Sequence, residues 1–158
     1  MKTLDYIGLS GEKVSPVVLS LHQLLADFQI YYSNLRGFHW NIKGHDFFVL
    51  HSQFEKMYND AAEKVDEIAE RILTLGSKPS NKYSEYIRVS KIKEVDHITS
   101  GDAAISNILE SMTHFIQSER NILSEASEAG DEVTVALMSD YLKEQEKLVW
   151  MLTAYSSK

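Results

Sequence analysis

Six residues in the first half of the chain concentrate the side chains from which a metal site could be built. They are His39, Trp40, His51, Glu55, Asp66 and Glu70. His51 and Glu55 are four residues apart, as are Asp66 and Glu70, so on a helix each pair shares one face and can approach one ion. Imidazole and carboxylate groups are ligands that suit iron, manganese or zinc.

The distance between the two pairs along a helix decides how a site can form. At about 100° per residue, all four side chains fall on one side of the helix. From His51 to Asp66 the helical rise gives about 22 Å, which is too far for both to bind one ion. Either the chain carries two separate half-sites, or the halves meet by pairing with a second chain. A two-fold dimer with this helix antiparallel would set the first pair of each subunit against the second pair of the other.

The same residues also have interpretations without a metal. An Asp and a Glu four residues apart on a surface helix are usually a solvated face. A single histidine such as His51 is more often packed or exposed than a ligand. His39 beside Trp40 can be an aromatic helix end. Spacing alone therefore leaves metal binding open.

Apolar residues recur at helical spacing in four long segments, each bounded by residues typical of helix ends. The predicted helices run from Pro16, capped by Ser15, to about Trp40; from the cap Asp46 to Gly76; from about Asp102 to Ala129; and from the cap Asp131 past Leu152. Between Lys78 and Gly101 the pattern weakens, and only residues 83–89 are candidates for a short helix. The sequence therefore predicts an all-α four-helix bundle with a long crossover between its second and third helices.

Length and composition set the remaining bounds. The chain of 158 residues fits one domain, 1–158, with a short N-terminal extension, 1–14. The absence of cysteine excludes disulfides, thiolate zinc sites and cysteine nucleophiles. No apolar run reaches the length of a signal peptide or a membrane span, so we expect a cytoplasmic protein without a membrane partner. A formal charge of −7 argues against tight binding to the phosphates of nucleic acid.

The segment from Leu35 to Ile72 resembles the most characteristic stretch of the Dps family, the mini-ferritins named as DNA-binding proteins from starved cells. The matching signature is His-Trp, a second His twelve residues after the first, and then Asp-x-x-x-Glu. The similarity continues through the last helix, GDEVTVALMSDYLKEQEKLVW. The resemblance implies a ferritin-like four-helix bundle with a short extra helix in the crossover, assembled as a hollow homo-dodecamer.

The resemblance also implies a ferroxidase site at each two-fold interface. One subunit would supply His39, His51 and Glu55, its partner would supply Asp66 and Glu70, and Trp40 would lie beside the site. Glu55 departs from the commoner Asp of the family, which keeps the carboxylate and adds a methylene. The implied activity is oxidation of Fe(II), usually with hydrogen peroxide, followed by storage of ferric mineral, as protection against oxidative stress.

A second hypothesis is a structural or DNA-compacting dodecamer with a vestigial metal site. Relatives that bind DNA often use a basic tail, whereas Lys2 and Lys13 stand here beside Asp5 and Glu12. We therefore expect no strong DNA binding. A third hypothesis is a monomeric helical binding module.

Three other groups of polar residues receive weaker assignments. Glu94 and His97 match a Glu-x-x-His pair but fall in the crossover without a second copy, so we assign them no metal. Glu63 and Glu67 are candidates for mineral nucleation or for a solvated face. The acidic residues early in the last helix either line ion pores, as often in the family, or balance the helix dipole; they are Asp131, Glu132, Asp140 and Glu144.

Overall fold

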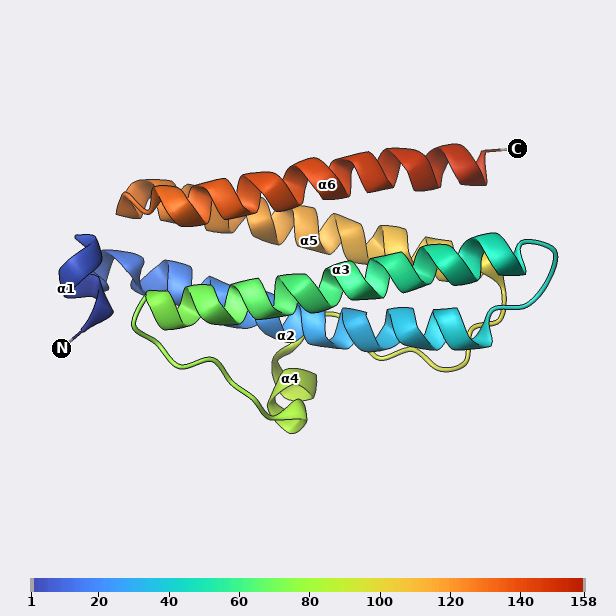
Figure 1. The fold of residues 1–158 in the computed structure, drawn as a ribbon, viewed down its shortest axis with the longest axis horizontal. Helices are drawn as coiled ribbons and strands as arrows, with labels where there is room; N and C mark the ends of the chain where they lie inside the picture. The colour runs from blue at the N-terminus through green and yellow to red at the C-terminus, as the bar shows by residue number, and fades with distance from the viewer. Residues whose placement is uncertain (1, 158) are drawn as a thin grey trace.

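Four long helices form a bundle in the computed structural model, which describes residues 2–157. In chain order the helices are α1 (Thr3–Ile7), α2 (Gly11–Asn41), α3 (Phe47–Thr74), α4 (Tyr83–Val89), α5 (Gly101–Ala129) and α6 (Glu132–Ser156). Helices α2 and α3 form one antiparallel pair, and α5 and α6 form the other (Figure 1). Residues 2–157 contain no strand. The predicted all-α four-helix bundle, with a short helix in the long crossover, is confirmed.

The first long helix begins earlier than predicted. Its first residue is Gly11, its backbone ladder starts with Val14 N donating to Ser10 O at 3.0 Å, and Pro16 lies inside the helix. The prediction that Ser15 caps this helix and Pro16 opens it is therefore wrong. The additional turn is stabilised by tertiary packing, because Val14 is buried in the core.

Most other helix ends agree with the predicted ones to within one residue, although α3 ends at Thr74, two residues before Gly76. Asp46 precedes α3, and α5 begins at Gly101 with Ser100 as its cap. Gly130 ends α5 in the left-handed region, at φ 73°, which glycine adopts without steric cost. Asp131 then caps α6 by accepting a hydrogen bond from the backbone N–H of Thr134.

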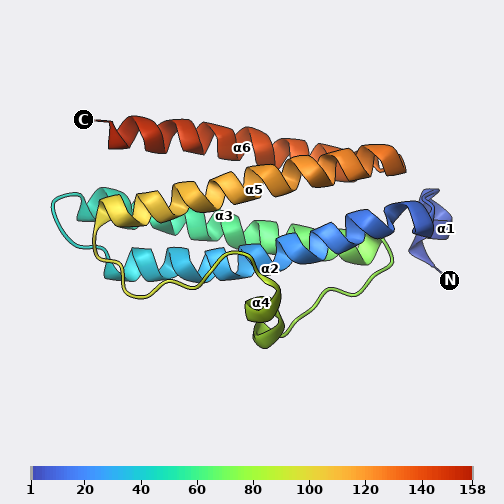
Figure 2. The same ribbon diagram turned by 180° about the vertical axis from the view of Figure 1, so that it is seen from behind.

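The crossover lies along α2 because polar side chains of that helix bind its backbone (Figure 2). The buried carboxylate of Asp27 accepts hydrogen bonds from Ser90 Oγ at 3.0 Å and from the N–H of Lys91 at 2.7 Å. Further along α2, Asn34 Nδ2 donates to the carbonyl of Lys93 at 2.8 Å. These contacts fix the path of the crossover, because buried polar side chains of α2 need hydrogen-bond partners and the crossover backbone supplies them.

None of the helices within residues 2–157 has the length and apolar character needed to cross a membrane.

The centre of the bundle contains a carboxyl group with no charged partner in direct contact. Glu119 of α5 is 0% exposed, and Gln145 Nε2 of α6 donates to its Oε1 at 2.6 Å. Burial raises the pKa of Glu119 to about 8. The second oxygen of Glu119, Oε2, and the amide oxygen of Gln145, Oε1, have no partner within residues 2–157. A proton on Glu119 removes the charge that burial penalises and supplies a donor for this pair of oxygens.

Glutamine at position 119 should therefore stabilise the protein in a pH-dependent way. Burial raises the pKa of Glu119 in the folded protein to about 8. The neutral carboxyl therefore contributes fully to stability below the pKa that Glu119 has in the unfolded chain, and this contribution is lost as the pH rises through about 8. Glutamine does not ionise, so the Glu119→Gln variant should gain on the order of 2–3 kcal/mol at pH 7 and almost nothing near pH 4.5. Denaturation midpoints measured across this pH range check it; a gain that is equal at every pH would contradict it.

Candidate metal centre

Two histidines, one near the end of α2 and one near the start of α3, face each other across the turn that joins these helices. The Nδ1 atom of His39 lies 2.7 Å from the backbone oxygen of His51, and His51 Nδ1 lies 2.7 Å from the backbone oxygen of His39. The rings are stacked, with centroids 3.7 Å apart and planes 18° apart. Each imidazole therefore fixes the orientation of the other.

This reciprocal bonding also decides which ring nitrogen carries the proton. A backbone carbonyl oxygen only accepts, so Nδ1 must donate in both rings. In the neutral ring the lone pair of Nε2 is then free on His39 and on His51. Histidine ligands in metalloproteins commonly have this arrangement, in which a carbonyl bound to one nitrogen sets the tautomer and the other nitrogen binds the metal.

Two aromatic residues surround the histidine pair, and neither was among the predicted site residues. The ring of Phe47 stacks on His51 with centroids 4.9 Å apart. The Tyr58 ring meets His39 edge-on at 5.3 Å. Partial burial and the neighbouring Glu55 carboxylate raise the pKa of the Tyr58 hydroxyl. The spacing of Tyr58, seven residues after His51, was the available signal, because residues seven apart share a helix face.

The structure does not bring the five predicted ligands together in one chain. His39 is buried and His51 half-buried, whereas Glu55, Asp66 and Glu70 are exposed on α3. Within residues 2–157, no three His, Asp or Glu side chains are placed to hold one metal ion. The two halves stay apart because His51 and Glu55 lie on the same helix as Asp66 and Glu70, with about 22 Å of helical rise from His51 to Asp66.

Trp40 lies at the surface next to His39, with 66% of its side chain exposed. The guanidinium of Arg36, one turn earlier, lies 5.6 Å from its ring and 4.5 Å from the ring of Tyr32. An indole this exposed in a single chain is available for contact with a partner.

The remaining acidic candidates separate into different environments. Asp131 is 1% exposed and forms an ion pair with Arg71, so of the two interpretations left open for it, a pore residue or a charge at the start of the helix, the structure supports the second. Glu67 accepts a hydrogen bond from Tyr141 Oη at 2.7 Å. His97 pairs with the adjacent Asp96 at 3.0 Å on the surface.

Comparisons with known proteins agree on the type of fold. A family model described as a ferritin-like domain matches residues 18–158. The DNA protection during starvation protein of Porphyromonas gingivalis is 54% identical over 157 residues, which cover 99% of each chain. A Dps protein from Vibrio cholerae O1, described as a member of a broad superfamily of ferritin-like diiron-carboxylate proteins, has a crystal structure that aligns with a TM-score of 0.93 at 44% identity, over 96% of this chain and 95% of its own. A Dps protein from Bacillus brevis aligns with a TM-score of 0.89 at 29% identity, over 92% of this chain and 98% of its own.

Proposed function

The chain belongs to the Dps family of ferritin-like proteins, and from this premise we propose that it is a ferroxidase that oxidises Fe(II) and stores the ferric product. Iron is its substrate, hydrogen peroxide its preferred oxidant, and protection against oxidative stress its purpose. Each active site lies between two subunits of a homo-dodecameric cage. The cytoplasm is the proposed location.

The observation that carries the proposal is the stacked pair of His39 and His51. Their reciprocal bonds leave two Nε2 lone pairs available, and the exposed Glu55 follows His51 by one turn of α3. Nothing in the core requires this arrangement, since a stacked apolar pair would fill the same space. Three ligands on one chain form half of a site and leave the rest to a partner.

The positions of the proposed ligands on α3 define how α3 of a partner subunit would align with it. A two-fold axis that crosses α3 between Asp60 and Ala61 places Glu55 opposite Asp66 of an antiparallel copy. The same axis places His51 opposite Glu70, because the two pairs are equidistant from it. One symmetry operation therefore completes both half-sites at once, and the dimer gains two equivalent sites.

A row of eight residues on the same face of α3, which we call the α3 seam, fits this register. Its members recur at alternating steps of four and three residues, the spacing of helices that pack side by side: Phe48, Ser52, Glu55, Asn59, Ala62, Asp66, Ala69 and Leu73. None of them is buried within the chain. The proposed axis maps the seam onto itself. Phe48 meets Leu73, and the short side chains of Asn59 and Ala62 meet at the centre, where the helices approach most closely.

The chemistry follows from the ligand types. Imidazole nitrogens bind Fe(II) well, and carboxylates stabilise the harder Fe(III) product. Two Fe(II) ions that together give both electrons to one hydrogen peroxide, with two protons, yield two waters and no hydroxyl radical. A site that gathers two imidazoles and three carboxylates from two chains provides ligands for such a pair.

The activity is tested by following the formation of Fe(III) optically after Fe(II) is added to the purified protein, with peroxide and separately with air. Rapid peroxide-dependent oxidation well above the protein-free rate is expected. A rate equal to that control would contradict the proposed activity.

Glutamate at Leu73 should weaken the seam without altering any ligand. Leu73 is 51% exposed in the single chain, so the substitution leaves its fold intact, yet it places a charge against Phe48 of the partner subunit. Each of the two contacts in a dimer loses on the order of 1–2 kcal/mol of apolar burial. Fe(II) oxidation should fall in dilute Leu73→Glu protein and recover as its concentration rises.

The matched control is Val133→Glu, which changes an exposed apolar residue on α6, outside the seam. Oxidation by this variant should not follow the concentration dependence of Leu73→Glu. If both variants behave like the wild type at every concentration, the proposed register is incorrect.

The relatives' name, DNA protection during starvation protein, fits two mechanisms, direct DNA binding or removal of iron and peroxide. The net charge of −7 per chain favours the second, because bringing acidic copies onto phosphates is electrostatically unfavourable. Protection by iron chemistry is therefore part of the proposal, and DNA compaction is not.

A further inference from the structure

Arg36, near the end of α2, carries a guanidinium that aromatic rings hold in place but that no acidic group neutralises. Its Cζ lies 4.5 Å from the centroid of the Tyr32 ring and 5.6 Å from that of Trp40. None of the ion pairs among residues 2–157 includes Arg36, and its Nε is buried without a hydrogen-bond partner in the same part of the chain. A guanidinium stays charged in proteins, so this side chain can still bind an acidic group from outside the chain.

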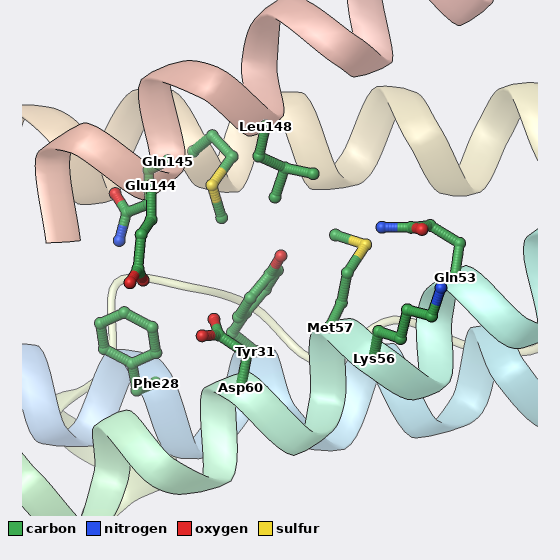
Figure 3. Close-up of a pocket in the computed structure, with 10 residues that line it drawn as sticks. Phe28, Tyr31, Gln53, Lys56, Met57, Asp60, Glu144, Gln145 and Leu148 are labelled. Atoms are coloured by element: carbon green, nitrogen blue, oxygen red, sulfur yellow. The ribbon is translucent and has the colours of Figure 1, made fainter.

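A second cation near α3 is neutralised within the chain. In the groove between α3 and α6, Lys64 Nζ lies 2.6 Å from Asp60 Oδ1 and 2.7 Å from Glu144 Oε2. Figure 3 shows the carboxylates of Asp60 and Glu144 extending from their helices into the space between them. Arg36 lies on the other side of α3, toward α2, and has no such counterpart. The unpaired cation is therefore on the side where the proposed half-sites lie.

The contacts between α2 and α3 show which part of α3 lies beside Arg36. The stacked histidine pair and the rings of Tyr32 and Tyr58, whose centroids are 6.1 Å apart, align the two antiparallel helices. Each histidine is seven residues from the tyrosine of its own helix, so a step back along α2 matches a step forward along α3. Arg36, three residues before the histidine of α2, is therefore level with Phe54 and next to Glu55.

The proposed two-fold pairing brings a carboxylate of the partner subunit to the same level. It sets Asp66 of the partner subunit opposite Glu55, and Glu70 of the partner subunit opposite His51. Each interface site then gathers three carboxylates, which repel one another when no metal is bound. Arg36 is the cation at this level that can offset the repulsion, because an opposite charge within about 4–6 Å favours the ionised form of a carboxyl group.

We propose that Arg36 binds the carboxylate of Asp66 of the partner subunit and thereby stabilises the metal-free interface. The inference rests on the proposed function, since it uses the same pairing of two chains. A carboxylate has two oxygens, so one can accept hydrogen bonds from the guanidinium while the other remains available to iron. Arg36 is thus a positioning residue, which directs a ligand supplied by the partner and offsets the charge of the site.

The experiment measures assembly in the presence of EDTA, as the protein concentration at which half of the chains are assembled. Arg36→Met removes the guanidinium and keeps an apolar stem against Tyr32 and Trp40. It should raise this concentration by about tenfold or more in protein with Asp66, but by less than about threefold in an Asp66→Asn background. Arg36→Lys retains the charge without the planar fork and should fall between the wild type and the methionine variant.

An equal effect of Arg36→Met in both backgrounds would overturn the proposal, because Arg36 would then act only through its contacts with Tyr32 and Trp40. Charge exchange is the second test should the methionine variant fail to fold. Arg36→Glu combined with Asp66→Arg should assemble about tenfold better than Arg36→Glu alone. No recovery in the combined variant would also overturn the proposal.

Zinc, which these conditions do not oxidise, separates this proposal from the proposed function. Added in place of EDTA, Zn(II) should restore the assembly of Arg36→Met, because a bound cation replaces the missing charge. Coupling between Arg36 and Asp66 without any response to zinc would support the ion pair and count against the metal ligands. A response to zinc without coupling would support the ligands and overturn the role of Arg36.

Discussion

Alanine at Asp66 should reduce peroxide-dependent oxidation of Fe(II) by about 100-fold or more, because the substitution removes a proposed metal ligand. Loss of a residue that only supports a ligand already weakens metal sites by about 10–100-fold. His51→Ala should have the same effect from the other half of the site. Asp66 is exposed in the single chain and His51 only half-buried, so neither change removes packing from the core. Initial rates of Fe(III) formation, measured on protein of wild-type assembly size, give the comparison.

The control for both variants is Glu110→Ala, which removes an exposed carboxylate of α5 at a position with no assigned role. Its rate should equal that of the wild type. Normal oxidation by both the His51 and Asp66 variants would show that the ligand assignment is wrong, even if the protein oxidises iron by another site.

Alanine at Asp131 should cost about 3–5 kcal/mol of stability, because it leaves the guanidinium of Arg71 buried without its counter-charge. Asp131 and Arg71 form an ion pair that is almost fully buried. The carboxylate also accepts hydrogen bonds from Thr134 N at 3.0 Å and Thr134 Oγ1 at 2.6 Å, so the variant loses the cap of α6 as well. Denaturant unfolding of the wild type and of Asp131→Ala measures the difference.

An exposed ion pair between α5 and α6 provides the comparison. Glu146 accepts from Arg120 at the surface, where both side chains are more than half exposed. Glu146→Ala should therefore cost less than about 1 kcal/mol. If the Asp131 and Glu146 variants lose equal stability, the Arg71 pair does not have the buried character that the structure gives it.

Much of the fold could be predicted from the sequence, because its helices follow local rules. Apolar periodicity identified the four long helices, and local end signals such as Gly130 and the cap Asp131 placed most of their limits. The early start of α2 could not be predicted in the same way. It depends on the burial of Val14, and tertiary packing there outweighs the preference of Pro16 for the first turn.

The candidate site was predicted in its residue types but not in its geometry. The spacing of His51 and Asp66 already indicated that one helix cannot bring the two halves together. The reciprocal bonds between His39 and His51 were beyond prediction, because they depend on how the turn after α2 folds α3 back beside it. Buried charges were missed for a related reason. Lys64 lies on the apolar stripe of α3, three residues after Ala61 and four before Ile68, and nothing local in the sequence shows that its ion partner is Glu144 of α6.

The most direct test of the shared site mixes two inactive variants, His51→Ala and Asp66→Ala. In a two-fold dimer with one chain of each kind, one interface site carries both substitutions and the other carries none. Random pairing should therefore restore about a quarter of the wild-type rate of Fe(II) oxidation, although each variant alone is inactive. As a control, a chain with both substitutions, paired with the wild type, leaves no intact site in the mixed dimer. Recovery of activity in the first mixture is the predicted result, and a mixture as inactive as its components would contradict a site shared between two chains.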